Sequence, residues 1–388
     1  MRFPSFEGEW ETKKLGEVAT NKSEKYNPAN ETDYIKCIEM EHLTTDTGQL
    51  LGYIDGSTSG SIKNVFNEGD VLFGKLRPYL KKYLQAPFDG VCSSEIWVLK
   101  GKNISNDFLY RIVQTKLFID LANQSSGSKM PRADWNVVES GFFGIPTPLE
   151  QKKISSFLAL LDERIQTQNK IIEELKLLKI TISKKLFSRQ LRFKNGNNEN
   201  YIDWNTKKLG EVTTLVNKRN KNNEKLPVYS INNKLGFVPQ SEQFEGVDSE
   251  DRGYDIKLYK IIDKNTFAYN PARINVGSIG YSKNLENIII SSLYVCFKTD
   301  NTINDNFLYQ YLKTDFFNRE VLRNVEGGVR DYLFYDNFAR IKFGLPCIEE
   351  QKKIADYLSS IDSKIDIESQ LLHKFEKQKR YLLANLFI

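Results

Sequence analysis

Two long stretches of the chain repeat apolar residues in alternating steps of four and three. The first stretch follows Thr147 and holds no proline or glycine between Pro148 and Gly196, and the second begins near Cys347. This spacing, continued over several heptads, predicts long helices that pair along an apolar seam. The predicted seam residues are Ile154, Leu158, Leu161, Ile165, Ile172 and Leu175 in the first stretch, and Ile354, Leu358, Ile361, Ile365, Leu372 and Phe375 in the second.

Polar residues interrupt both seams at the same steps. They are Gln168 and Lys179 in the first seam and Glu368 and Lys379 in the second. A long solvent-flanked helix can tolerate such residues, but their recurrence favours a role in fixing the register between two helices. The spacing of Thr147, Pro148 and Glu150 indicates a helix start with an N-cap, a first-turn proline and a capping box. A helix of about 38 residues would extend roughly 57 Å, which is typical of a spacer.

The remaining sequence predicts two globular domains of mixed helix and strand, so the fold class is α+β. We expect the first domain at 1–146, a central helix at 147–190, the second domain at 191–346 and a C-terminal helix at 347–388. The clearest strand-like runs are 70–73, 96–99, 287–290 and 293–297, and short helices are expected at 107–113 and 306–312. The polar, Asn-rich segment 193–200 predicts a flexible link.

Two motifs occur twice. The sequence WETKKLGEV from Trp10 returns 194 residues later as WNTKKLGEV from Trp204, and EQKKI from Glu150 returns 200 residues later at Glu350. Such a duplication suggests two similar sites related by a pseudo-two-fold axis. Between the motifs the two domains share little sequence, which is expected of a common scaffold whose two sites read different targets.

Composition excludes several classes of protein. The net charge of the 388 residues is only +5, and the first domain carries 17 basic against 19 acidic residues, so any surface for a polyanion must be a local patch. The four scattered cysteines argue against a zinc site and for a reducing cytoplasm. We expect neither a secretory leader nor a membrane span.

No catalytic motif is complete. Gly69 to Leu76 resembles a phosphate-binding loop but has Leu76 where a Ser or Thr must bind magnesium. The segment from Tyr269 to Ala272 lacks the second proline and the aromatic residue of an adenine methyltransferase motif. The two histidines, His42 and His373, lack a nucleophile or metal-ligand partner in the sequence pattern. We interpret the acids near His42 as ordinary surface residues and His373 as a surface residue.

Basic loops are the remaining candidates for function. Arginine can fork to guanine in the major groove, and lysine suits phosphate. The loop after 70–73 and the comparable loop after Tyr269 each carry an arginine, and a Gly-bearing loop ending in arginine occurs in both domains. Singly, each could be a solvated turn, but their matched occurrence favours binding. The candidate DNA-binding residues are Lys75, Arg77, Lys81, Lys82, Lys129, Arg132, Lys218, Arg219, Arg273 and Arg330.

In the order and spacing of these motifs the chain resembles the specificity subunit of type I restriction–modification systems. The resemblance covers essentially the whole chain and rests on the repeated Trp-x-x-Lys-Lys-Leu-Gly-Glu-Val openings and on the Gly-x-Pro-x-x-x-Glu-Gln-Lys-Lys-Ile transitions into long helices. It implies two target-recognition domains separated by two helices that pair as an antiparallel coiled coil. Each domain would read one half of a split, asymmetric site on double-stranded DNA.

The resemblance also implies partners. Two methyltransferase (modification) subunits would dock on the helices, and restriction subunits would join that core. S-adenosylmethionine, ATP and magnesium would belong to these partners, and this chain would hold no cofactor and catalyse nothing. The weakly acidic first domain puts strong DNA binding by the chain alone in doubt. The alternative is an antiparallel coiled-coil adaptor whose globular ends bind proteins. A standalone methyltransferase or nuclease fits the sequence poorly.

Overall fold

The chain folds as two compact units. This computed structural model describes residues 2–30, 33–124, 130–243, 255–326 and 332–387. One unit comprises Met1–Lys170 with Ser369–Ile388, and the other comprises Ile171–Glu368. Each unit therefore contains one globular domain, the first part of the long helix that follows it and the last part of the other long helix.

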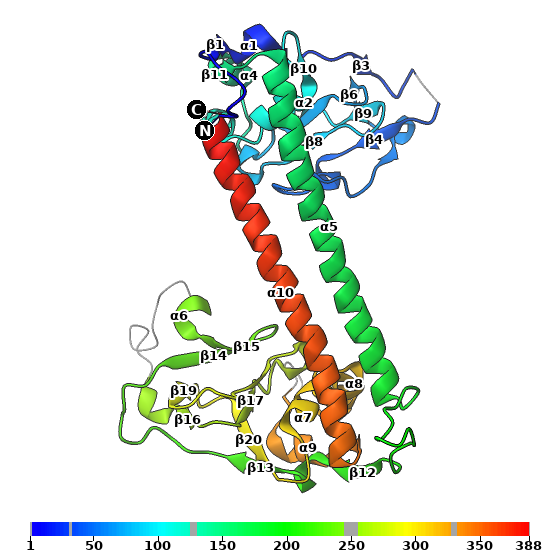
Figure 1. Cartoon of the computed structure of the whole chain (residues 1–388), viewed down its shortest axis with the longest axis vertical. Helices are drawn as coiled ribbons and strands as arrows, with labels where there is room; N and C mark the ends of the chain where they lie inside the picture. The colour runs from blue at the N-terminus through cyan, green and yellow to red at the C-terminus, as the bar shows by residue number, and fades with distance from the viewer. Residues whose placement is uncertain (1, 31–32, 125–129, 244–254, 327–331, 388) are drawn as a thin grey trace. The chain divides into compact units, whose positions relative to one another are not determined.

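The two long helices are α5 (Pro148–Phe187) and α10 (Ile348–Leu386), drawn in green and in orange to red in Figure 1. In the first unit Ile154 and Leu158 of α5 share a core with Leu382 of α10, and in the second unit Leu358 of α10 shares a core with Leu186 of α5. The start of each helix thus packs against the end of the other, so the pairing is antiparallel. Every predicted seam residue is buried or partly buried. The predicted antiparallel coiled coil is confirmed.

The start of α5 differs in one respect from the prediction. The Thr147 hydroxyl accepts a hydrogen bond from the Glu150 amide, at a long 3.4 Å. The Glu150 carboxylate, however, is buried and accepts two hydrogen bonds from the Arg2 guanidinium, at 2.8 and 2.7 Å. The predicted capping box is therefore only half formed. Thr147 accepts from the Glu150 amide as expected, but the Glu150 carboxylate binds the charged Arg2 guanidinium, which is the stronger donor.

The first unit contains three small sheets and four short helices. The sheets have the strand orders β1-β11, β2-β10-β7-β8 and β3-β6-β9-β4-β5. The strands are β1 (Glu11–Lys14), β2 (Ala19–Thr20), β3 (Lys25–Tyr26), β4 (Lys36–Ile38), β5 (Ile54–Asp55), β6 (Lys63–Phe66), β7 (Val71–Gly74), β8 (Tyr83–Gln85), β9 (Gly90–Cys92), β10 (Ile96–Gly101) and β11 (Phe142–Ile145). The helices are α1 (Leu15–Val18), α2 (Asn106–Ile112), α3 (Lys116–Ala122) and α4 (Trp135–Ser140), and the 3-10 turns are η1 (Met40–His42), η2 (Gly56–Thr58) and η3 (Pro78–Leu80).

The second unit repeats this topology except that no described strand corresponds to β3. Its sheets have the orders β12-β21, β13-β20-β17-β18 and β15-β14-β19-β16. The strands are β12 (Asn205–Lys208), β13 (Thr213–Val216), β14 (Val228–Asn232), β15 (Gly236–Pro239), β16 (Lys260–Ile262), β17 (Phe267–Tyr269), β18 (Ile279–Tyr281), β19 (Ile288–Ile290), β20 (Val295–Thr299) and β21 (Lys342–Leu345). The helices are α6 (Gln240–Gln243), α7 (Asp305–Tyr311), α8 (Asp315–Asn324) and α9 (Tyr335–Arg340), and the 3-10 turns are η4 (Leu209–Glu211), η5 (Ile256–Leu258) and η6 (Ile274–Val276).

The two domains share even the unusual feature of one parallel pair in a largely antiparallel sheet. Strand β4 runs parallel to β9 in the first unit, and β14 runs parallel to β19 in the second. The predicted strand-like runs correspond to β7, β10, β19 and β20, and the predicted short helices to α2 and α7. These elements were predictable because each has a continuous apolar run or a capped amphipathic turn.

The repeated motifs build the junction between each domain and its long helix. The strand after Trp10 pairs with the strand that precedes α5, and the strand after Trp204 pairs with the strand that precedes α10. A β-carbon at Gly144 would lie 2.8 Å from the Trp10 ring, and one at Gly344 would lie 2.9 Å from the Trp204 ring. The glycine of each Gly-x-Pro motif is therefore needed so that the tryptophan can pack on the strand.

The start of the segment expected to be a flexible link is fastened to α10. The Arg192 guanidinium donates to both oxygens of the buried Glu350 carboxylate, and the Phe193 ring packs edge-on against Tyr357, with ring centroids 5.7 Å apart. The Lys353 ammonium donates to the Lys194 carbonyl at 2.6 Å. Only the start of 193–200 makes these contacts, and residues 196–200 are exposed, so the flexible link stays a prediction.

Candidate nucleic-acid interface

Arg77 lies in the loop that follows the central strand β7. Its backbone is in the left-handed region, with φ 52° and ψ 62°, and its amide donates to the Pro131 carbonyl at 2.8 Å. Such a conformation is uncommon for a residue other than glycine. The loop then turns at Pro78, the first residue of η3. The Arg77 side chain is exposed, and no hydrogen bond or ion pair of its guanidinium is recorded among the described residues.

The other predicted basic residues of the first domain that are described surround the same loop. The Lys75 carbonyl accepts from the Ala133 amide at 2.8 Å, and Leu76 forms a β-bridge with Arg132. The structure therefore brings Lys75, Arg77 and Arg132 together, although more than fifty residues separate the first two from the third. Lys129 lies outside the described residues.

Three of these basic side chains already have partners. The Arg132 guanidinium donates to both oxygens of Glu95, at 3.2 and 3.0 Å, and these hydrogen bonds raise the pKa of Arg132. The Lys81 ammonium lies 3.3 Å from Asp46, and the Lys82 ammonium donates to a backbone carbonyl at 2.6 Å. Arg77 is therefore the arginine of this cluster that is presented to solvent without a carboxylate.

Arg273 occupies the equivalent place in the second domain. It follows β17, which has the central position of β7 in a sheet of the same order. The Leu333 amide donates to the Pro271 carbonyl at 3.0 Å, as Ala133 donates to Lys75 in the first domain. Arg273 is exposed, with no side-chain partner recorded among the described residues. The accepting carbonyls belong to Lys75 and Pro271, and the arginine follows two residues later in each domain. Arg77 and Arg273 are therefore at equivalent positions.

The expected match between Arg132 and Arg330 is not supported. Since Leu333 is the counterpart of Ala133 by its hydrogen bond, the counterpart of Arg132 is Tyr332. Arg330 itself lies outside the described residues. The predicted role of Arg330 stays a prediction, because the sequences of the two loops do not give their register and Arg330 is not described.

Lys218 and Arg219 lie apart from Arg273. Arg219 forms a β-bridge with Lys260, at the β16 edge of the second sheet, and Lys218 pairs with Asp263 at 3.4 Å. The loop of Arg273 instead approaches the turn after β14, because a β-carbon at Gly277 would lie 2.9 Å from the Asn233 carbonyl oxygen. Strand β14 is separated from that edge by β19. Both basic residues are exposed.

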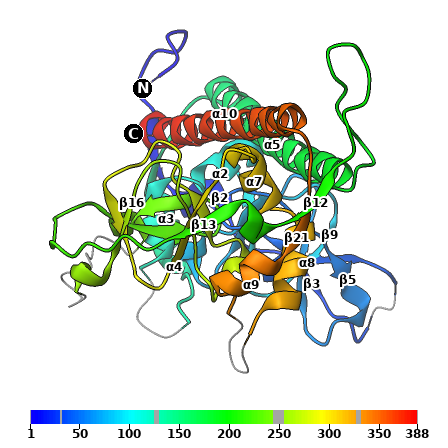
Figure 2. The same cartoon turned by 90° about the horizontal axis from the view of Figure 1, so that it is seen from below.

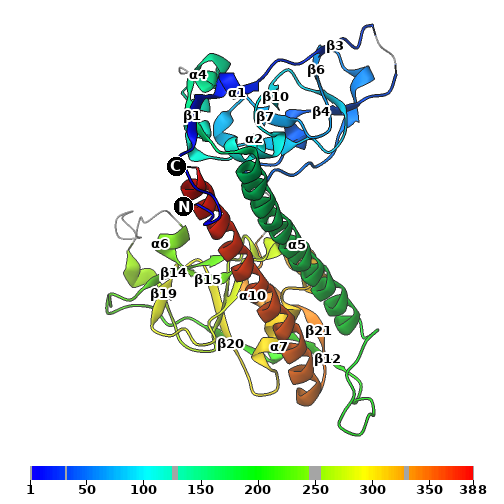
Figure 3. The ribbon, with the colours of Figure 1, turned by 45° about the horizontal axis from the view of Figure 1, so that its top comes forward.

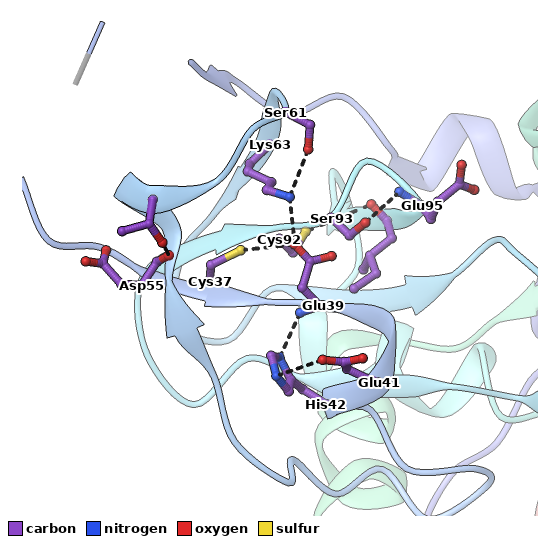
Figure 4. Close-up of polar contacts among 12 residues, drawn as sticks. Cys37, Glu39, Glu41, His42, Asp55, Ser61, Lys63, Cys92, Ser93 and Glu95 are labelled. Atoms are coloured by element: carbon purple, nitrogen blue, oxygen red, sulfur yellow. Dashed lines mark hydrogen bonds and ion pairs between the residues drawn. The ribbon is translucent and has the colours of Figure 1, made fainter. Parts of the chain in front are cut away.

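A buried polar cluster in the first domain offers no catalytic chemistry. Figure 4 shows the Lys63 ammonium between Ser61 and Glu39, with distances of 3.0 and 2.6 Å, and His42 Nδ1 accepting from the Glu39 amide at 2.9 Å. Burial raises the pKa of the Cys37 thiol to about 12, so it is not a nucleophile near neutral pH. No group of three or more His, Cys, Asp or Glu residues able to hold a metal ion occurs in the described part of the chain.

The sequence analysis missed the residues that fasten each domain to its helix. Gln151 accepts from the Ser105 amide and donates to the Pro146 carbonyl, and Gln351 accepts from the Asn304 amide and donates to the Pro346 carbonyl. The ion pairs Arg2–Glu150 and Arg192–Glu350 lie beside these glutamine contacts. The repeated Glu-Gln dipeptide therefore attaches each domain to the start of its long helix. A repeated signal was present: the dipeptide Arg-Phe occurs at Arg2 and again at Arg192.

The comparisons with known proteins agree with this repeated architecture. The family model for the type I restriction modification DNA specificity domain matches residues 7–177 and again 201–377. The chain belongs to this family. The MjaVIII type I restriction enzyme specificity subunit of Methanocaldococcus jannaschii is 27% identical over 96% of this chain and 87% of its own length.

Solved structures show the same fold. A chain from a study of the assembly and conformational transition of a type I restriction–modification system has a TM-score of 0.60 and 19% identity, covering 97% of this chain and 96% of its own. The type I S subunit from M. genitalium has a TM-score of 0.57 and 16% identity, covering 98% and 96%. The predictions of a type I specificity subunit, and of a chain that is not itself an enzyme, are confirmed. No helix among the described residues is long and apolar enough to span a membrane.

Proposed function

We propose that this specificity subunit reads a bipartite, asymmetric site on double-stranded DNA, one half with the loop of Arg77 and the other with the loop of Arg273. One observation carries the proposal: two equivalent loops follow equivalent central strands, and each presents an exposed arginine without a recorded carboxylate partner. The surrounding residues differ between the two copies. A shared frame with different surroundings suits two unlike half-sites.

The chemistry of the loops suits this role. An arginine can donate two hydrogen bonds to guanine in the major groove, and lysines nearby contact phosphates. Lys75 would add a phosphate contact beside Arg77, and Lys218 with Arg219 would do so at the sheet edge of the second domain. Arg132, Lys81, Lys82 and Lys218 would have to leave their present partners to contact DNA. Of the predicted basic residues described in the first domain, only Lys75 and Arg77 have no recorded side-chain partner, and we expect weak DNA affinity without partner subunits.

The long helices offer a surface for those partners. Away from the seam they expose large apolar side chains, which a partner protein would cover. Examples are Leu149 at 75% exposure, Leu160 at 62%, Leu177 at 65%, Ile180 at 60% and Ile367 at 59%. We propose that two modification (methyltransferase) subunits dock here and that restriction subunits join the complex. S-adenosylmethionine, ATP and magnesium would be held by these partners in the cytoplasm.

The decisive experiment replaces one loop arginine at a time. The chain is expressed with its modification partner, and methyladenine is mapped by single-molecule sequencing. We expect Arg77→Ala to relax or abolish recognition of one half-site and Arg273→Ala to affect only the other half. A base-reading arginine should cost about 1–3 kcal/mol, concentrated at one position. Lys116→Ala, which removes a highly exposed lysine from α3, is the control. If both arginine variants weakened both halves equally, independent readout would be excluded.

The docking role has its own test. Ile165→Asp combined with Ile365→Asp places carboxylates in the seam, where both residues are partly buried, and a buried unpaired charge is costly. We expect helix pairing to loosen and the modification subunits to be lost, as measured by analytical ultracentrifugation of the assembled complex. Unchanged assembly would remove the helix pair from the proposed docking site.

The competing function is a coiled-coil adaptor whose globular ends bind proteins. Each phosphate contact gives a slope of about −0.9 in a plot of log affinity against log salt. A steep slope for the assembled complex on DNA would exclude the adaptor. Binding that is indifferent to salt and to sequence would favour it.

A further inference from the structure

Asp162 joins three elements of the first unit. It projects from α5 and pairs with Lys379 of α10, with 2.7 Å between the ammonium nitrogen and a carboxylate oxygen. It also accepts a charged hydrogen bond from Arg111 of α2, the helix that lies beside the start of α5 in Figure 3. The Arg111 side chain is only 5% exposed, and its Nε has no hydrogen-bond partner among the described residues. Asp162 is therefore the main acceptor for a buried cation.

Asp362 makes the same connection in the second unit. It projects from α10 and accepts two hydrogen bonds from Lys179 of α5, at 2.6 and 2.7 Å. It also accepts one from the Gln310 amide of α7, at 2.9 Å. Helix α7 lies against the helix pair within this unit (Figure 2). Lys179 and Lys379 are the polar interruptions of the predicted seams, and here each finds its carboxylate on the opposite helix.

The apolar contacts of the seam do not by themselves define one orientation. The hydrophobic effect is non-directional, so apolar side chains can accommodate a small rotation or sliding of the helices. Hydrogen bonds to charged groups are short and directional. Each aspartate therefore sets how its domain helix, its own long helix and the opposite long helix meet at one point.

We propose that Asp162 and Asp362 are positioning residues that hold each recognition domain at a defined angle on the helix pair, and so set the length of the gap between the two DNA half-sites. This inference rests on the function proposed above. It adds to it a specific pair of carboxylates, together with Arg111, Gln310, Lys179 and Lys379, as determinants of the gap rather than of the half-site sequences.

The two anchors are unequal. Asp162 is held by two cations, whereas Asp362 is held by one cation and one neutral amide. Asp162 is also the more buried, with its side chain 21% exposed against 39% for Asp362. The attraction between opposite charges increases as water is excluded. At this anchor the first domain is thus held more tightly than the second, and we infer that tolerance of a wrong gap arises mainly from the anchor of the second domain.

The inequality supplies matched variants. Arg111→Gln gives the first unit the neutral partner found in the second, and Gln310→Arg gives the second unit the charged partner found in the first. Each variant is expressed with its modification partner on a plasmid library whose gap is one base pair shorter, native or one base pair longer. Methylation of each gap class is scored by single-molecule sequencing. Lys176→Gln, which removes an exposed ion pair with Glu173 within α5, is the control.

We expect Arg111→Gln to raise methylation of wrong-gap sites at least threefold relative to native-gap sites, with both half-site sequences unchanged. Gln310→Arg should lower it by a similar factor, and Lys176→Gln should leave it unaltered. A merely structural role would reduce total methylation or thermal stability without changing the preference between gaps, and that result would overturn the proposal. If Arg111→Gln fails to fold, Gln310→Arg alone decides, because it replaces the neutral donor to Asp362 with a charged one.

The outcome separates the two proposals. A split motif with an unchanged gap preference in the variants would overturn the role of the aspartates and leave the proposed DNA readout intact. The absence of any split motif with the wild-type chain, despite an active modification partner, would overturn both.

Discussion

Glu350 is fully buried at the start of α10, and its replacement by glutamine should destabilise the second unit. Its carboxylate accepts hydrogen bonds from Arg192 Nε at 3.1 Å, Arg192 Nη2 at 2.8 Å and Trp204 Nε1 at 3.0 Å. Glutamine has nearly the same shape but carries no charge, and its amide hydrogens would face the donors of Arg192. The change therefore leaves a guanidinium without its main counter-charge.

The magnitude follows from the burial of the two partners. Removing one member of a buried ion pair typically costs about 3–5 kcal/mol. The Arg192 side chain is 16% exposed, and it keeps hydrogen bonds to the carbonyls of Tyr201 and Ile202. Because Arg192 keeps this residual solvation, we expect Glu350→Gln to lower the free energy of unfolding of the second unit by about 2–3 kcal/mol. For a unit of this size, that corresponds to a decrease of roughly 4–12 °C in its melting temperature.

The equivalent change in the first unit is the matched comparison. Glu150→Gln removes the charge that faces Arg2, whose side chain is 29% exposed, and no tryptophan donor is recorded for Glu150. We therefore expect a smaller loss. Urea unfolding followed by hydrogen exchange with mass spectrometry measures both units, and Trp204 fluorescence reports on Glu350 directly. Equal losses for the two variants, or no loss for Glu350→Gln, would refute the reasoning.

Two further predictions concern thiols and glycines. Cys347 is partly exposed, whereas Cys37 is buried and burial raises the pKa of its thiol to about 12. At pH 8 a disulfide reagent should therefore modify Cys347 first and Cys37 only on unfolding. Equal rates of modification would contradict the burial of Cys37. Gly210→Ala places a β-carbon 2.7 Å from a β-carbon of α9 and should cost about 1–3 kcal/mol in thermal unfolding. Gly196→Ala, which meets nothing within 4 Å, is its control, and equal effects would show that the clash relaxes freely.

The sequence was sufficient for the parts of the fold whose pattern is long or repeated. The two heptad stretches predicted α5 and α10 because periodicity sustained over dozens of residues is rarely accidental. The five-stranded sheet was not predicted. Strands such as β4 and β5 contain three and two residues, which is too short for an alternation to be recognised. Strand β5 pairs with β4, and β4 in turn pairs with β9, which lies more than fifty residues away in the sequence.

The candidate site was predicted less completely for a related reason. The sequence placed Arg77 and Arg273 in comparable loops because both follow an apolar strand. It could not show that Arg132 pairs with Glu95, since 37 residues separate them and the contact depends on the fold of both loops. Nor could it show that Tyr332, and not Arg330, is the position equivalent to Arg132. That equivalence follows from the matching backbone hydrogen bonds of Ala133 and Leu333.

The contacts between the domains and the long helices also explain which residues are identical in the two repeats. Glu150, Gln151 and Asp162 recur as Glu350, Gln351 and Asp362, and each of these residues bonds a domain to a long helix. The loops of Arg77 and Arg273 share little beyond their arginine, and neither arginine side chain has a recorded partner in the described part of the scaffold. A substitution in either loop therefore removes no contact on which the junctions depend. If the two proposals hold, the DNA site would change through the loops, whereas the spacing proposed for the helices and their aspartates would persist.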